Sequence, residues 1–208
     1  MPASTTIHRL ADRARYDRET VDRILDDAYV AHVGAVVDGA PVVLPFACAR
    51  AGDELVLHGS TRAGTLSLIV DGTPVCATVT HVDGLVLARS GFHSSMNYRS
   101  VAIHGVARAV TNRDEKIRLL DAVMDHLLPG RRAAIRGMNE GELEAVAVVA
   151  IPLTTFSAKV RTGGPKDAPE DLASTEIWGG VIPLHTSFGD PIPDAATAPG
   201  VPPPSVTR

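Results

Sequence analysis

The sequence predicts a mainly β protein, a small antiparallel barrel of six or seven strands with helices inserted between them. Three observations predict this fold. Apolar residues make up 45% of the chain but aromatic residues only 4%, so the core must be built from Val, Ala, Leu and Ile, and the Val-rich runs are typical of strands. Asp-Gly pairs separate several of these runs and suit tight hairpin turns. No GxGxxG motif follows any predicted strand, which disfavours a βαβ dinucleotide-binding fold.

The N-terminal half begins with a helix and continues as a β-meander. Asp17 is expected to cap the helix, because its carboxylate can accept hydrogen bonds from the free amides of the first turn. Val21, Ile24 and Leu25 then form an apolar stripe at helical spacing. The strands expected next are 29–37, 41–49 and 54–58, and a short helix is expected over 64–70.

The C-terminal half adds more strands and one clear helix. The strands are expected at 74–82, 85–89, 97–110, 145–153 and 155–161, with a tight turn at Asp83-Gly84 and a polar loop of about eight residues before position 97. Asn112 begins the helix, since Glu115 stands at the capping-box position, and Pro129-Gly130 ends it. From residue 183 the chain is rich in Pro and lacks periodicity, which indicates an extended or partly disordered tail.

Length and composition suggest one domain over 17–182, with an N-terminal arm (1–16) and a C-terminal tail (183–208). A net charge of −4 without runs of like charge argues against nucleic-acid binding. No apolar run is long enough to span a bilayer, and the N-terminus lacks the apolar core of a secretory signal, so a cytoplasmic protein without membrane contact is expected. Cys48 and Cys76 are interpreted as small buried thiols, and the scattered histidines lack metal-ligand spacing.

The segment HGSTRAGT (58–65) lies between a predicted strand and a predicted helix. Its glycines let backbone amides approach an anion, and a helix N-terminus carries a positive dipole end. Ser60 and Thr65 add hydroxyl groups, and Arg62 can form two hydrogen bonds with phosphate oxygens. Walker spacing is absent, so a single phosphate group is the natural ligand. Ordinary helix capping is an equal alternative.

The polar loop before position 97 and the strand start after it form a second candidate region, because a connecting hairpin loop is usually shorter. Tyr98 could pack on an aromatic ring, or it could plug the barrel mouth. Arg99 could bind the same phosphate, or it could form a surface ion pair. His93 could donate a proton, although a single loop histidine is more often a hydrogen-bonded surface residue.

A third candidate region is the end of the last predicted strand. Lys159 and Arg161 share one strand face, and two neighbouring cations repel each other unless an anion or a carboxylate lies between them. Trp178, the only tryptophan, is either an aromatic platform or a cover over an apolar patch. The chain shows no Ser/His/Asp order, nucleophile elbow or close carboxylate pair. A catalytic role would therefore depend on a cofactor.

Three segments together resemble a known family: GDELVLHGSTRAG, THVDGLVLARSGFHSSMNYRSVAIHG, and SAKVRTGGPKD followed by WGGVIPL. Over about Tyr16 to Pro183 the chain is similar to the pyridoxamine 5′-phosphate oxidase-like superfamily, most closely to its flavin-nucleotide-binding and nitroimidazole-resistance branch. The resemblance implies a split β-barrel homodimer with FMN at the subunit interface. The Arg-x-His substrate signature of true pyridoxamine phosphate oxidase is missing near the C-terminus, which disfavours pyridoxal phosphate synthesis.

The resemblance also implies which residues bind FMN. Ser60, Arg62 and Thr65 match the phosphate-binding segment, and Pro45 and Phe46 end the strand whose backbone meets the isoalloxazine ring. The remaining matched positions line the site, partly from the second subunit; they are Asn97, Tyr98, Arg99, Ser100, Lys159, Arg161 and Trp178.

These observations lead to the hypothesis of an FMN-dependent oxidoreductase that acts on a small, flat, conjugated or electron-poor substrate, with NADH or NADPH as a candidate electron donor. Arg161 or Lys159 would stabilise negative charge on the reduced ring, and His93 is a candidate proton donor. Three alternatives remain open: a non-catalytic flavin carrier or sensor, a haem-binding protein with His93, His81 or His104 as axial ligand, and a deazaflavin-binding protein.

Overall fold

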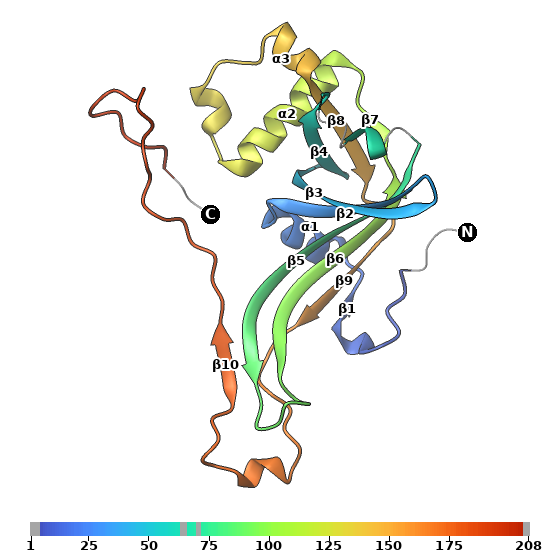
Figure 1. The fold of residues 1–208 in the computed structure, drawn as a ribbon, viewed down its shortest axis with the longest axis vertical. Coiled ribbons are helices and arrows are strands. Elements are labelled where there is room, and N and C mark those ends of the chain that lie inside the picture. Colours follow the sequence, from blue (N-terminus) through green and yellow to red (C-terminus); the bar gives the residue numbers. More distant parts are fainter. Residues whose placement is uncertain (1–4, 63–65, 70–71, 206–208) are drawn as a thin grey trace.

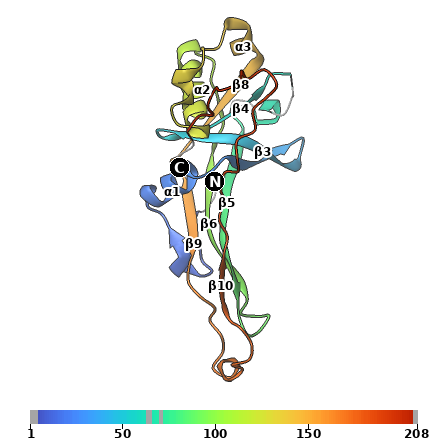
Figure 2. The same ribbon diagram turned by 90° about the vertical axis from the view of Figure 1, so that its left-hand side faces the viewer.

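The computed structural model describes residues 5–62, 66–69 and 72–205. Its strands form one sheet in the order β1-β9-β6-β5-β2-β3-β4-β8-β7, every pair antiparallel, with β10 paired to β5 beside this path. The sheet curls into a half-barrel, so the expected mainly β split barrel with peripheral helices is confirmed (Figures 1 and 2). The strand bounds are β1 Ala14–Arg15, β2 Val30–Val37, β3 Ala40–Ala51, β4 Glu54–Ser60, β5 Pro74–Leu87, β6 Ser95–Val106, β7 Arg108–Ala109, β8 Val146–Pro152, β9 Phe156–Arg161 and β10 Gly180–Pro183.

The first helix closes one side of the barrel core. α1 (Arg18–Asp26) begins as predicted, with the Asp17 carboxylate accepting a hydrogen bond from the Thr20 amide at 2.8 Å. Its buried face, Val21, Ile24 and Leu25, packs against the interior side chains of the strands. Because these three residues recur at helical spacing, one face of α1 is apolar and the other remains polar.

A second apolar layer lies on the other side of β3, β4 and β8. α2 (Arg113–Leu127) and α3 (Glu140–Ala145) cover these strands in the upper part of Figure 1, and Leu119, Leu120 and Val123 contribute the α2 side of this layer. Asn112 caps α2 as predicted by accepting a hydrogen bond from the Glu115 amide. β8 is therefore buried on both faces, which explains its nearly continuous apolar sequence.

The lower part of the molecule differs from the prediction in one important respect. The two strands expected on either side of Asp83-Gly84 are a single 14-residue strand, β5, and the register with β6 shifts between Val82 and Gly84. The Asp-Gly pair therefore lies at a β-bulge rather than at a hairpin turn. A bulge inserts one extra residue without reversing the chain, and Gly is common at such positions.

Further differences concern short elements. The helix expected over 64–70 falls partly outside the described residues, and the described part, Leu66–Ile69 (η2), is a single 3-10 turn. The other 3-10 turns are η1 (Ala11–Arg13), η3 (Arg131–Ala134) and η4 (Asp171–Ala173). β10 was not predicted, since four residues next to a Pro-rich segment carry almost no periodic signal. Beyond β10 the tail is exposed through residue 205 and has no further helix or strand, with two turns in which the Thr197 amide donates to the Asp194 carbonyl and the Val201 amide to the Ala198 carbonyl.

Candidate functional site

The pairing of β6 with β9 brings together the central residues of the predicted site. Tyr98 lies directly opposite Arg161, and Ser100 lies directly opposite Lys159. Opposed residues in an antiparallel pair point to the same face of the sheet, so each pair can contact a common ligand. The face they share is the outer one, because the interior of the barrel is filled by the alternate residues Val101, Ile103 and Ala158.

Arg161 is unusual among these residues because its positive charge is buried without a carboxylate partner among the described residues. Its side chain is buried, with 6% of the residue exposed, and its guanidinium donates hydrogen bonds to the Asn97 Oδ1 atom and to the carbonyl oxygens of Gly163 and Gly164. No ion pair within the described residues neutralises it. Burial lowers the pKa of Arg161, and the nearby Arg13 lowers it further.

A buried guanidinium without a carboxylate keeps most of its cost of desolvation. An anionic ligand group would reduce that cost, because opposite charges attract strongly where water is excluded. The environment of Arg161 therefore favours the binding of an anionic group next to its guanidinium. Lys159 adds a second positive charge on this part of β9, and its Nζ atom donates a hydrogen bond to the Arg9 carbonyl at 3.1 Å.

Arg99 has a different environment. Its guanidinium contacts the carboxylates of Asp83 (3.0 Å) and Asp27 (2.6 Å), which join β5 and the end of α1. The hydrogen bonds to Asp83 raise the pKa of Arg99, and those to Asp27 add to this effect. The structure thus supports the ion-pair alternative for Arg99, because both carboxylates compete with any phosphate.

The proposed phosphate segment lies apart from these residues within one protomer. Ser60 ends β4 opposite Val146 of β8, and Ser60 and Arg62 are both exposed. The Arg62 amide donates a hydrogen bond to the Ser60 hydroxyl at 3.2 Å. Figure 1 shows β4 in the upper half of the molecule, whereas β6 begins and β9 ends in the lower half. Thr65 lies outside the described residues.

Pro45 and Phe46 lie on β3 and face opposite sides of the sheet. Pro45 is exposed opposite His32 of β2, whereas Phe46 is buried in the barrel core. The Phe46 side chain is therefore committed to packing, and only its backbone is available to a ligand. That the backbone of this strand meets a flavin ring stays a prediction.

His93 and Trp178 lie near the tip formed by the β5–β6 hairpin and the connection from β9 to β10. The His93 ring contacts the Phe92 ring edge to face, with 5.1 Å between centroids, and 61% of Trp178 is exposed. The tip is tied together by Arg89 and Asp167, whose side chains form an ion pair at 2.8 Å. Among the described residues of one protomer, no hydrogen bond or ring contact joins His93 or Trp178 to Arg161.

Two further features, one at the tip and one on β4, were missed at the sequence level. The Asp167 carboxylate is almost fully buried and also accepts a hydrogen bond from the Arg89 amide, a contact across 78 residues that no local pattern signals. The His58 Nε2 atom is buried without a hydrogen-bond partner among the described residues, and burial lowers the pKa of this histidine. A histidine within an otherwise apolar strand was the only sequence signal for it.

The structure also contains an apolar groove of about 730 Å³. The β2–β3 hairpin, the start of β5, the end of β6 and the chain after β8 line it, and His104 and Cys76 are among its residues. The ring of the third candidate histidine, His81, lies elsewhere and contacts the Ile24 carbonyl at 3.0 Å. The described residues contain no group of three or more His, Cys, Asp or Glu side chains that could hold a metal ion. No described helix has the length and the apolar character that a bilayer crossing requires.

Comparison with known families is decisive for the ancestry of the chain. Residues 17–160 match the family model described as pyridoxamine 5′-phosphate oxidase. The chain belongs to this family. The family model ends just before Arg161, so β10 and the tail lie outside it. The search of curated proteins found no match.

Two solved structures are similar over nearly the whole chain. The flavocytochrome Anf3 from Azotobacter vinelandii is 38% identical, with a TM-score of 0.88, over 96% of this chain and 92% of that chain. The FAD and heme binding protein from Mycobacterium smegmatis is 40% identical, also with a TM-score of 0.88, over 92% and 94%. A protein described as a 5-nitroimidazole antibiotic resistance protein, from Bacteroides thetaiotaomicron, shares the fold at 22% identity and a TM-score of 0.59, over 71% and 86%.

Proposed function

We propose that this protein binds a flavin nucleotide on the outer face of β6 and β9 and acts as a flavin-dependent oxidoreductase on a small conjugated or electron-poor substrate. The observation that carries the proposal is Arg161, a buried guanidinium that lies opposite Tyr98 and lacks a carboxylate partner among the described residues. The family supports a flavin, and the two relatives near 40% identity are named for FAD and haem or as a flavocytochrome.

The side chains on the outer face of β6 and β9 have the charge and the aromatic character that a flavin ring requires. A bound flavin supplies hydride or single-electron transfer, which the side chains of this protein cannot perform themselves. Arg161 would stabilise negative charge on the reduced ring system, because a preorganised cation in a dry site acts strongly on developing charge. Tyr98 would cover a ring face, and Lys159 would add positive potential to the same side of the sheet.

Ser60 and Arg62 would hold a phosphate, but they lie in the other half of the protomer. This separation supports the proposal that two copies of the chain form a homodimer and share each flavin between them. The sequence predicted FMN, whose single phosphate matches the 58–65 segment. The name of the Mycobacterium smegmatis relative favours FAD instead, whose second phosphate would need a further cationic contact.

The test begins with the visible absorption spectrum of the purified protein and a mass spectrum of the extract after denaturation. A flavin spectrum with FMN or FAD in the extract is expected, and the Arg161→Ala variant should lose most of it. Arg118→Ala, which removes an exposed arginine on α2, is the matched control. A colourless protein that does not change the spectrum of added FMN or FAD would contradict the proposal. A deazaflavin would be recognised by its own absorption and mass.

Activity requires a separate measurement. Rapid-mixing experiments with NADH or NADPH should show that the protein-bound flavin is reduced faster than free flavin and is reoxidised by an electron-poor acceptor. A bound flavin without such turnover would identify a carrier or sensor instead.

Haem binding is the second candidate, because the apolar groove contains His104 and both close relatives carry a haem- or cytochrome-related name. Among the three candidate axial ligands, the His81 ring contacts the Ile24 carbonyl and His93 lies in the tip loop. His104 is therefore favoured. Added haem should give a Soret band that is lost in His104→Ala and retained in His81→Ala. No band in the unmodified protein would exclude this candidate.

A further inference from the structure

The N-terminal arm, residues 5–15, lies against the edge of the barrel next to the proposed flavin site. η1 leads into β1, which pairs with β9 and places Ala14 directly opposite Lys159 (Figure 1). The Lys159 Nζ atom donates a hydrogen bond to the Arg9 carbonyl at 3.1 Å, so a side chain of β9 also holds the arm. The arm precedes residues 17–160, which the family model covers. Its contribution to the site is therefore additional to the family pattern.

Three cations lie where the arm contacts β9: Arg13, Lys159 and Arg161. Arg13 ends η1, directly before β1, and its positive charge adds to the effect of burial in lowering the pKa of the Arg161 guanidinium. Lys159 and Arg161 share one face of β9, because side chains two positions apart in a strand point to the same side. None of the three forms an ion pair within the described residues. Their positive charges therefore remain available to a ligand.

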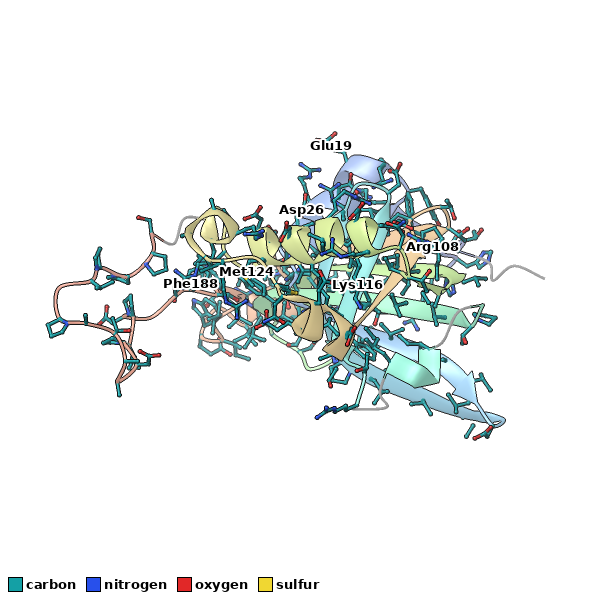
Figure 3. The ribbon with its side chains drawn as sticks, turned by 90° about the horizontal axis from the view of Figure 1, so that it is seen from above. Glu19, Asp26, Arg108, Lys116, Met124 and Phe188 are labelled. Carbon is teal, nitrogen blue, oxygen red and sulfur yellow. The ribbon has the colours of Figure 1, made fainter. Side chains whose placement is uncertain are left out.

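This excess of positive charge is local. The chain as a whole has a net charge of −4, and elsewhere arginines such as Arg50 and Arg108 each contact two carboxylates. The carboxylates of α1 are directed away from the cluster: Asp26 pairs with Arg50, and Glu19 lies at the outer rim of the molecule in Figure 3. Neighbouring like charges repel each other unless an anion lies between them. The cluster therefore favours an anionic ligand group.

One negative charge on a flavin ring would not neutralise all three cations. In the proposed function Arg161 stabilises the charge of the reduced ring, which leaves the charges of Arg13 and Lys159 unbalanced. A molecule that exchanges hydride with a flavin must lie against its ring, so its substituents come near these side chains. Gly163 and Gly164 leave room beside Arg161, since a Cβ atom at either position would meet no atom within 4 Å. A carboxylate suits such a place, because a guanidinium can bind it through two parallel hydrogen bonds.

We propose that the substrate of the flavin site is a conjugated acid, and that Arg13 binds its carboxylate while Arg161 stabilises charge on the ring. This inference rests on the proposed function, because it names the substrate class of the same site. The arm is one wall of the site, and Lys159 fixes it through the Arg9 carbonyl. A neutral molecule of the same shape binds more weakly, since it leaves the cations without an anion.

The test compares two electron-poor probes of nearly the same shape, 4-nitrobenzoate and 4-nitrobenzamide, of which only the first is charged at pH 7. Isothermal titration calorimetry of the protein as purified, without an electron donor, measures the binding of each. 4-Nitrobenzoate should bind about tenfold more tightly, and Arg13→Ala should remove most of this preference by weakening the charged probe alone. Arg15→Ala is the matched control. It removes the same charge from the same arm, where the Arg15 guanidinium donates only to the carbonyls of Asp12 and Ala14.

Flavin binding together with equal affinity for the two probes would overturn this inference and leave the flavin proposal standing. A preference that survives in Arg13→Ala, or that Arg15→Ala removes equally, would overturn it as well. If Arg13→Ala weakens FAD binding more than FMN binding and leaves both probes unchanged, the cation belongs to the second phosphate of FAD and the substrate assignment is wrong.

A protein that binds no flavin but keeps an Arg13-dependent preference would contradict the proposed function and support the anion site alone. Loss of both flavin binding and probe preference would overturn both proposals. Salt dependence in the unmodified protein is a second measurement that does not depend on the folding of a variant. The preference for 4-nitrobenzoate should fall as the salt concentration rises, because dissolved ions screen the cations. A preference that salt does not change would contradict an electrostatic origin.

Discussion

Two arginines lie on neighbouring strands, Arg99 on β6 and Arg161 on β9, and they differ in whether carboxylates neutralise their charge. Arg99 is about one-third exposed, and two carboxylates from α1 and β5 neutralise it. Arg161 is buried, contacts only neutral oxygens among the described residues and has Arg13 nearby. The first guanidinium connects parts of the fold, and the second has its charge available for a ligand. Residue type is identical, so the difference comes entirely from the counterions that the tertiary structure supplies.

The largest change in stability is expected from a substitution on α1, the helix that precedes Asp27, one of the two carboxylates paired with Arg99. Leu25 is fully buried on α1, two residues before Asp27. Leu25→Ala should lower the free energy of unfolding by about 3 kcal/mol, because the removed side chain leaves a cavity in the core. Urea unfolding measures this change. Val30→Ala, an exposed position on β2, is the control and should cost less than about 1 kcal/mol.

Substitution of the two arginines should have different effects on flavin affinity. Arg161→Ala should weaken flavin binding by about 10- to 100-fold, since a charge-assisted hydrogen bond contributes about 1.5–3 kcal/mol. Its effect on the unfolding of the flavin-free protein should stay within about 1 kcal/mol, because the lost packing is offset by removal of an unneutralised buried charge. Arg99→Ala should change flavin affinity less than twofold. Equal losses in a fluorescence titration of both variants would contradict this contrast.

The Arg99 ion pair should have a small, measurable coupling. A double-mutant cycle with Arg99→Ala and Asp83→Ala should give an interaction energy of about 0.5–1 kcal/mol, because both side chains are one-third exposed and solvent screens the pair. Raising the salt concentration should reduce this energy. A coupling near zero would show that Asp27 alone neutralises Arg99.

The smallest effect is expected from a third arginine, Arg89, whose ion pair with Asp167 should contribute to stability at neutral pH and lose that contribution in acid. The hydrogen bond from the Arg89 amide lowers the pKa of Asp167 below its ordinary value of 3.8, and the Arg89 guanidinium adds to this effect. The folded protein therefore holds this carboxylate ionised more strongly than the unfolded chain does. Its stabilisation is complete above the unfolded pKa and is lost as the pH falls through the lower, folded pKa. Asp167→Asn should lower Tm at pH 7, and the difference from the unmodified protein should shrink near pH 3.

Prediction from sequence succeeded for features that depend on interactions between residues close together in the chain. The Asp17 and Asn112 caps depend on residues three positions apart, and the alternation of apolar side chains depends on neighbours two positions apart. Asp83-Gly84 was interpreted wrongly as a turn, because Gly in a strand suits a bulge as well as a hairpin. Only the pairing of β5 with β6 along its whole length distinguishes the two.

In the candidate site, too, some features follow from local sequence patterns and others from the tertiary structure. The sequence by itself determined a mainly β fold, two helix starts, and the hydroxyl and cationic side chains available to a flavin, since each follows from short-range spacing and residue chemistry. The tertiary structure decided which cations keep a free charge: Asp27 and Asp83 come to Arg99 from 72 and 16 residues away, and no carboxylate among the described residues reaches Arg161. Electrostatic neutralisation depends on distance in space, and distance in space between remote residues is fixed only when the strands pair.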